Sequence, residues 1–260
     1  MAFRFDLKVI LVAGSLQQIT NFSPNPSNAG MFVYKPTKLA SPPPVLVAIH
    51  YYGGSAQAYY SGTQYATLAD QYGYIVIYPN VPANQGGCWD VASNATLTHN
   101  GGSDSLGIVS MAKYAVSTWG GDVNRVFVTG TSSGAMMTNV LIGAYPDVFQ
   151  GGAAFSGVPY GCFAGPSSWN SQCSQGQLIK TAQQWVCGLF ESDLNSRGDY
   201  RVTWSELLIQ DTRGHVPRCK SGTEQRKYFY CKGEFLRYIN AKLFSDTTLY
   251  PQNYYEEVCW

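Results

Sequence analysis

Charged residues and histidines are scarce in this sequence. Only 13% of its 260 residues are charged, and the formal net charge is +1. Nucleic acids and anionic membranes bind strongly basic surfaces, so this balance excludes both as expected partners. No apolar run reaches the roughly 18 residues of a membrane-spanning helix. The histidines number three, and their spacing from the cysteines gives no zinc-binding pattern, so we expect no metal site.

Hydrophobic and aromatic residues, in contrast, are plentiful. Hydrophobic residues make up 45% of the chain, which is enough for a sizeable core in one large domain or two small ones. Aromatic residues make up 14%, with 19 tyrosines. Such a content is common where flat sugar rings stack on a protein surface.

Short apolar segments alternate with helical patterns from about residue 14 to residue 186. The pattern predicts strands over 31–34, 45–50, 74–78, 126–129 and 153–156, and helices over 64–71, 105–119 and 135–145. Asp104 stands where it could cap the second of these helices. Alternation of this kind predicts an α/β fold with a mostly parallel sheet flanked by helices, and no internal repeat is visible.

The most specific local signal surrounds Ser132, in VFVTGTSSGAMM. A β-branched strand leads into Gly-x-Ser-x-Gly, and a helical pattern follows. A nucleophile elbow requires this strand-to-helix turn, because it holds the serine in a strained conformation with its hydroxyl exposed. We expect glycine at 130 and 134 because a side chain at either position would collide with the neighbouring turn. The alternative is an ordinary connection between a strand and a helix.

Six stretches taken together resemble the fungal acetylxylan esterases of carbohydrate esterase family one and the related feruloyl esterases. The resemblance covers most of residues 15–186 and 245–257. The matching stretches are SLQQITNF (15–22), residues 47–79, residues 88–108, VFVTGTSSGAMMTNV (126–140), FSGVPYGCF (155–163) and DTTLYPQNYYE (246–256).

This resemblance implies an α/β-hydrolase with a serine–histidine–aspartate triad. Ser132 would be the nucleophile, and Asp246, in the loop that matches the family's acid, would orient the histidine. The backbone N–H groups of Tyr52 and Ser133 would hold the oxyanion. Such a mechanism needs no organic cofactor and no metal.

The resemblance also implies a secreted, extracellular, monomeric enzyme that removes acetyl groups from acetylated xylan or a related cell-wall polysaccharide. Residues 1–14 read as a degenerate signal peptide, because the apolar core over 9–13 is short. If the chain is exported, Asn21 and Asn94 lie in glycosylation sequons.

Other functions remain open at this point. A feruloyl esterase or a polyester depolymerase would use the same elbow, and the sequence does not give the size of the acyl pocket. A catalytically impaired carbohydrate-binding homologue would keep an aromatic rim without turnover. We expect Trp89, Tyr59 and Tyr60 to form that rim.

The sequence departs from the family at the catalytic histidine. The family places this residue beyond the aspartate loop, but no histidine follows Asp246 in these 260 residues, so we expect a C-terminally incomplete fold. His50 ends a buried strand, where it would shape the oxyanion loop. His99 is expected on the surface or at the rim. His215 precedes Asp246, and its position does not favour a catalytic role.

Residues 187–244 differ in composition from the sequence on either side. More than a quarter of them are charged, against 13% for the whole chain. We interpret 15–186 as the catalytic core, 187–244 as a translated intron, and 245–260 as a remnant of the core. The charge-rich segment starts at Val186-Cys187, and a second stretch unlike the family starts at Val258-Cys259. GTATGT, a common fungal intron donor, can encode Val-Cys, so two translated introns would explain both. The alternative is a true insertion or lid, and a transcript read across codons 186–245 would decide between the two.

Cysteine use agrees with this division. Cys162 and Cys173 close a short loop and are expected to form a disulfide in an oxidising compartment. The family often has cysteine where this chain has Tyr52, so Cys88 either has lost a partner or is a buried free thiol. The remaining cysteines fall in the suspect sequence: Cys187, Cys219, Cys231 and Cys259.

Overall fold

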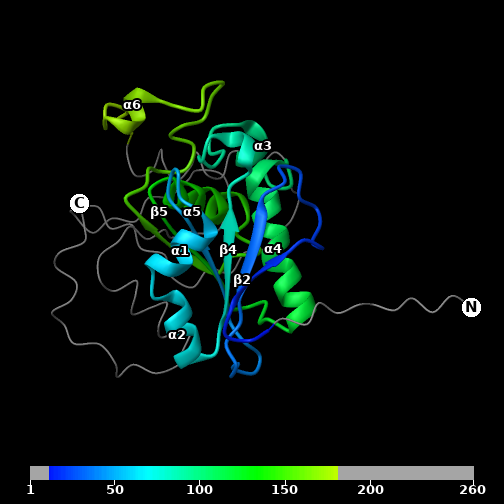
Figure 1. Cartoon of the computed structure of the whole chain (residues 1–260). Helices are drawn as coiled ribbons and strands as arrows, with labels where there is room; N and C mark the ends of the chain where they lie inside the picture. The colour runs from blue at the N-terminus through cyan, green and yellow to red at the C-terminus, as the bar shows by residue number, and fades with distance from the viewer. Residues whose placement is uncertain (1–11, 181–260) are drawn as a thin grey trace, which may run out of the picture.

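A computed structural model describes residues 12–180 of the chain (Figure 1). It contains a 6-stranded sheet in the order β1-β2-β4-β3-β5-β6. The strands are β1 (Leu16–Ile19), β2 (Gly30–Tyr34), β3 (Val45–Ile49), β4 (Ile75–Asn80), β5 (Val126–Thr131) and β6 (Gly151–Phe155). The helices are α1 (Ala56–Gly62), α2 (Tyr65–Tyr72), the 3-10 turn η1 (Ala83–Gln85), α3 (Asn94–Leu97), α4 (Ser103–Trp119), α5 (Ser133–Ala144) and α6 (Ser171–Ser174).

The sheet is mixed. Strands β4, β3, β5 and β6 run parallel, whereas β2 pairs antiparallel with β4 and β1 pairs antiparallel with β2. Strand β3 lies between β4 and β5, and every one of its residues is buried. Its register with β5 aligns Ile49 with Gly130, so the two strands end side by side. Their carboxyl ends form the edge at which open α/β sheets bind ligands.

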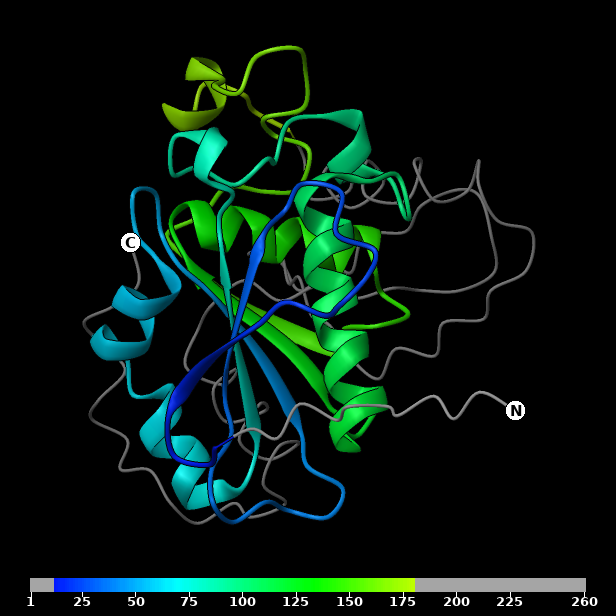
Figure 2. The ribbon, with the colours of Figure 1, turned by 45° about the vertical axis from the view of Figure 1, so that its right-hand side comes forward.

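Helices cover both faces of the sheet, with α1 and α2 on one side and α4 and α5 on the other (Figures 1 and 2). The alternation along β3 explains how both faces are filled. Val45, Val47 and Ile49 pack into the core under α4 and α5, and Leu46 and Ala48 pack into the core under α1 and α2.

Tyrosines tie the α1 and α2 layer to β5. The Tyr59 hydroxyl lies 3.0 Å from Thr131 Oγ1, and the Tyr65 hydroxyl lies 3.4 Å from Thr129 Oγ1. Burial raises the pKa of both phenols, so they stay neutral donors and acceptors. The sequence stretch that precedes Ser132 is therefore held from one face of the sheet by hydroxyl contacts.

The α/β-hydrolase class predicted from the sequence is confirmed, and all five predicted strands and three predicted helices are present with shifted ends. Strand β1 and helices α1, α3 and α6 were not predicted. The helix expected over 105–119 begins earlier, at Ser103. Gly102, with φ of 121°, occupies the cap position, so Asp104 lies in the first turn and the expected capping role was wrong.

Several expectations lie outside residues 12–180. They are the translated-intron reading of 187–244, the core remnant over 245–260, the missing C-terminal part of the fold, and the degenerate signal peptide over most of 1–14. Asp246 and His215 also lie outside the described part. Within residues 12–180, no helix combines the length and apolar character that crossing a membrane requires.

Candidate active site

Ser132 lies at the junction between β5 and α5. Its backbone has φ of 54° and ψ of −116°, an uncommon conformation for a residue with a side chain. The Ser132 N–H donates to the Phe155 carbonyl at 2.9 Å, which ties this strained residue to the end of β6. The residue is solvent-exposed, whereas Ser133 beside it is buried. This is the geometry that the nucleophile elbow predicts.

Two glycines make this turn sterically feasible. A Cβ on Gly130 would lie 2.4 Å from the Gly134 carbonyl group, and a Cβ on Gly134 would lie 2.2 Å from the Ile49 oxygen. Real side chains do not approach a backbone this closely. The first turn of α5 therefore packs directly against the end of β3, and the crowding expected at both glycines is confirmed.

We expect Gly134→Ala to lower the free energy of unfolding by about 3 kcal/mol, because neither the Ile49 nor the His50 carbonyl can move away without breaking the sheet edge. Gly62→Ala is the matched control. Gly62 also lies in a helix but has open space around it, so alanine should leave stability unchanged or raise it by up to about 1 kcal/mol. Urea unfolding of both variants measures the difference. Equal stability of the two would contradict the close packing of α5 on β3.

A tight turn follows β3 at the same edge. The Gly54 N–H donates to the Tyr51 carbonyl at 3.0 Å, and Gly53 has φ of 69°, which type II turns require at their third position. The Gly53 N–H donates to the Gly87 carbonyl at 3.0 Å, so a second loop holds the turn in place. This turn contains Tyr52, one of the two residues from which the sequence predicts an oxyanion-binding N–H.

His50 fixes the base of this turn, as expected. Its ring is fully buried, and its Nδ1 donates to the Tyr51 carbonyl at 2.7 Å. Its Nε2 accepts from the Val81 N–H at 3.1 Å, which sets the tautomer. Burial lowers the pKa of His50, so the ring is neutral. Since both ring nitrogens are engaged, His50 cannot take a proton from Ser132.

Trp89 joins three parts of the site, a role that the sequence did not reveal. Its backbone N–H donates to Ser133 Oγ at 3.2 Å, and its indole N–H donates to the His50 carbonyl at 3.0 Å. Its ring also packs on the His50 ring, with 5.1 Å between the ring centres. A tryptophan that is 2% exposed needs a partner for its N–H, but its burial follows from the fold, so the sequence held no signal of this role.

The His99 side chain is buried although the residue as a whole is half-buried, so the prediction that it lies at the surface or rim was wrong. Its side chain is 6% exposed and packs on the Tyr145 ring. The His99 Nδ1 donates to the Ala144 carbonyl at 2.7 Å, one of the carbonyls left without a partner at the end of α5. A helix rises about 1.5 Å per residue, which puts Ala144 about 18 Å from Ser132. His99 is therefore too far from Ser132 to act as its base.

The expected aromatic rim is also corrected. Trp89 is 2% exposed and Tyr59 is 4% exposed, because both fill the core beside the strand ends. Tyr60 is half-buried between the rings of Tyr34 and Tyr78. The most exposed aromatic residues within 12–180 are instead Tyr51, Tyr52 and Trp169.

Comparison with known proteins identifies the family. Residues 31–171 match the PHB depolymerase esterase family. The chain is 46% identical over 251 residues to the probable acetylxylan esterase A of Aspergillus flavus, covering 95% of this chain and 70% of the relative. It is 45% identical to acetylxylan esterase A of Aspergillus oryzae over the same shares. The chain belongs to the acetylxylan esterase A family.

A solved structure agrees with this assignment. The acetyl xylan esterase from Aspergillus awamori superposes with a TM-score of 0.66 and is 51% identical, over 68% of this chain and 66% of that one. The family resemblance predicted from the sequence is thus confirmed. Membership in the acetylxylan esterase family makes the chain a serine esterase by descent, with Ser132 at the position that the elbow geometry singles out.

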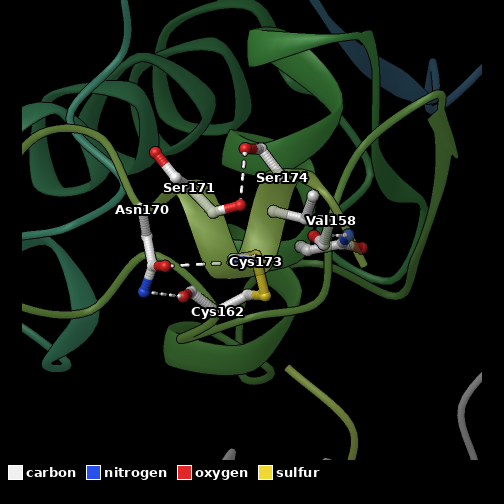
Figure 3. Close-up of a disulfide and its surroundings, with 7 residues drawn as sticks. Val158, Cys162, Asn170, Ser171, Cys173 and Ser174 are labelled. Atoms are coloured by element: carbon white, nitrogen blue, oxygen red, sulfur yellow. Dashed lines mark hydrogen bonds between the residues drawn. A yellow bond between two sulfur atoms is a disulfide. The ribbon is translucent and has the colours of Figure 1, made fainter. Parts of the chain in front are cut away.

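The loop after β6 carries the one disulfide of the described residues, between Cys162 and Cys173, with 5.8 Å between the Cα atoms (Figure 3). The Asn170 side chain donates to the Cys162 carbonyl and accepts from the Cys173 N–H, which closes the loop further. Cys88 is a half-exposed free thiol, 3.4 Å from Ser133 Oγ. It is therefore neither paired within residues 12–180 nor fully buried.

A carboxylate pair supports the loop that contains Trp89. Asp104 is fully buried and accepts from the Asp90 N–H at 2.8 Å and from the Gln85 side chain at 3.1 Å. Asp90 accepts from the hydroxyls of Ser93 and Ser103, each at 2.5 Å. Burial raises the pKa of Asp104. Burial also opposes ionisation of Asp90, but the serine hydrogen bonds outweigh it and lower the pKa of Asp90.

We expect Asp104 to make the acetylxylan esterase fold less stable as the pH rises. Its folded-state pKa lies above the ordinary value of 3.8, so the folded protein binds this proton more tightly than the unfolded chain does. The destabilisation is absent below 3.8 and complete above the folded pKa. The free energy of unfolding of the wild type, minus that of Asp104→Asn, should therefore fall as the pH rises from about 3 to 7.

Asp104→Asn also changes the free energy of unfolding by an amount that does not depend on pH, because it replaces one acceptor oxygen by a donor. The pH dependence of the difference, and not its size, is therefore the readout. A difference that grows with pH would mean that the hydrogen bonds from Asp90 and Gln85 outweigh burial and favour the carboxylate.

Proposed function

We propose that this chain is a serine esterase that removes acetyl groups from acetylated xylan. The observation that carries the proposal is the strained, exposed Ser132 at the junction of β5 and α5, in a chain of the acetylxylan esterase A family. The names of the relatives indicate the substrate, and the elbow geometry identifies the nucleophile.

The reaction would proceed through an acetyl-enzyme. Ser132 Oγ attacks the acetyl carbonyl carbon while its proton passes to a histidine. The tetrahedral intermediate collapses, the bond to the sugar oxygen breaks, and the histidine returns the proton to that oxygen. Water then attacks the acetyl-enzyme by the same route and releases acetate and free Ser132.

The negative charge on the carbonyl oxygen would be held by the N–H groups of Tyr52 and Ser133. The Ser133 N–H opens α5, where no intrahelical acceptor is available and the helix dipole favours negative charge. The Tyr52 N–H belongs to the turn that His50 and Gly87 hold in place. A rigid arrangement of donors is the main requirement for stabilising this intermediate.

We propose that the catalytic base and the orienting carboxylate are both residues beyond 180. His50 and His99 are each committed to other partners. We assign the orienting carboxylate to Asp246, from its match to the family's aspartate loop. The base is then a histidine outside the described residues. His215 is the one such histidine in these 260 residues, but its position before Asp246 does not favour the role, so we infer that the base is the family histidine that this sequence lacks.

We further propose that the enzyme is a monomer that works outside the cell. Asn21 and Asn94 are exposed, as glycan acceptors must be, and an oxidising compartment would maintain the Cys162–Cys173 disulfide. Expression in a secreting fungal host should give a single-chain species whose mass falls on endoglycosidase treatment. Absence of a glycan from both asparagines would contradict the glycosylation assignment.

The acyl specificity is tested by comparing the acids that the enzyme releases from two ester substrates. The enzyme should release acetate from acetylated xylan much faster than it releases ferulate from feruloylated xylan at equal ester concentration. Chromatography of the released acids measures both rates. Preferential release of ferulate would overturn the acetyl assignment while leaving the serine mechanism intact.

A further inference from the structure

Two adjacent tyrosines at the end of β3 are exposed to solvent. Tyr51 is 42% exposed and Tyr52 is 63% exposed. The Tyr51 ring still contacts the Tyr59 ring edge-on, with 6.4 Å between the ring centres. Tyr52 is the more exposed of the two. An aromatic side chain exposed at a strand end next to a nucleophile is a candidate ligand contact.

The backbone beneath Tyr52 is firmly held. Tyr52 occupies the second position of the turn from Tyr51 to Gly54, which its own backbone hydrogen bond closes. The His50 ring holds the Tyr51 carbonyl, and Gly87 holds the Gly53 N–H. A side chain on such a turn is presented to a ligand with little further loss of backbone entropy.

The turn lies beside Ser132. Strands β3 and β5 are parallel neighbours with Ile49 opposite Gly130, so the residues after Ile49 run alongside the approach to Ser132. Neighbouring strands lie about 4.8 Å apart. An ester whose carbonyl reaches Ser132 must therefore place its sugar close to this turn.

We propose that the side chain of Tyr52 is a stacking platform for one xylopyranose unit of the xylan main chain. This inference rests on the proposed esterase function for its choice of ligand. All substituents of β-xylopyranose are equatorial, so both faces of the sugar ring present axial C–H groups. The electron-rich face of a tyrosine ring attracts such hydrogens.

Stacking also orients the reacting ester. Acetyl groups on the equatorial oxygens project from the edge of the sugar ring and not from its faces. A sugar lying flat on Tyr52 therefore leaves its ester free to extend sideways toward Ser132. Tyr52 would then serve the reaction twice, through its ring on the sugar and through its N–H on the acyl oxygen.

The test measures binding without hydrolysis. The probe is deacetylated xylohexaose, titrated into the full 260-residue chain by calorimetry. Tyr52→Ala should weaken binding by roughly threefold to tenfold, the range expected for loss of one aromatic contact. Tyr52→Phe keeps the ring and should bind within about twofold of the wild type. Val123→Ala is the control, because Val123 is also exposed but precedes β5 at the opposite end of the sheet.

The outcomes separate this inference from the esterase function. Xylohexaose carries no ester, so its binding is independent of whether Ser132 hydrolyses anything. Equal affinity of Tyr52→Ala and the wild type would overturn the platform, provided that thermal unfolding shows both folded. Failure of the wild type to bind xylohexaose at millimolar concentration, or equally tight binding of maltohexaose, would overturn it as well.

Discussion

Replacing Ser132 by alanine should lower acetate release from acetylated xylan by about 10⁴- to 10⁶-fold in a form of the polypeptide that carries the triad histidine. Without the hydroxyl there is no nucleophile, and water must attack the ester directly. The strained conformation, the exposure and the position before α5 all belong to Ser132. Acetate measured enzymatically over time gives the rate.

Ser156→Ala is the matched control for this experiment. Ser156 is also an exposed serine with positive φ, of 59°, just after the neighbouring strand β6. No helix of the described residues begins directly after it, so no helix N-terminus lies behind it. Its replacement should leave the rate within about twofold. Activity that survives in Ser132→Ala would refute the serine mechanism.

The second large effect concerns the base. We expect the 260-residue polypeptide to hydrolyse acetylated xylan about 10⁴- to 10⁶-fold more slowly than the polypeptide translated after removal of the two suspected introns. Of its three histidines, His50 and His99 are bound to other groups, and His215 lies within the charge-rich segment. Without a base, Ser132 keeps its proton at neutral pH.

His215→Ala decides the alternative. If the base is absent from the 260 residues, this variant should hydrolyse at the same slow rate as the parent chain. Ser132→Ala in the parent chain should then lower the rate only a little further, because triad residues act as a unit. High activity in the parent chain that His215→Ala removes would instead identify His215 as the base. It would then also remove the reason to regard 187–244 as foreign sequence.

The sequence predicted the elbow because its determinants are local. Gly130, Ser132 and Gly134 lie within one turn of chain, and their crowding follows from backbone geometry alone. The buried parallel strands were predicted for the same reason, since VLVAI in β3 reads as apolar on both faces. Strand β1, with sequence LQQI, escaped detection because two glutamines interrupt its apolar character at the sheet edge.

Other features depend on contacts between distant segments, and these the sequence could not reveal. Trp89 and Tyr59 have aromatic side chains of the kind that line sugar-binding sites, but they are buried beside the strand ends. His99 sits in a glycine-rich loop that reads as exposed until the end of α5 provides its acceptor. The pairing of Asp90 with Asp104 likewise joins residues whose separate patterns gave no hint of contact.

The placement of Ser132 has a consequence for how the enzyme could lose or regain activity. Within residues 12–180, the contacts that fix the serine all come from 49–155: the glycines at 130 and 134, the carbonyl of Phe155, and the end of β3. The proton-transfer groups are sought after residue 180. The proposal thus assigns ester binding to residues 49–155 and proton transfer to residues after 180. A mutation confined to the residues after 180 would then leave a protein that still binds the ester but releases it unhydrolysed.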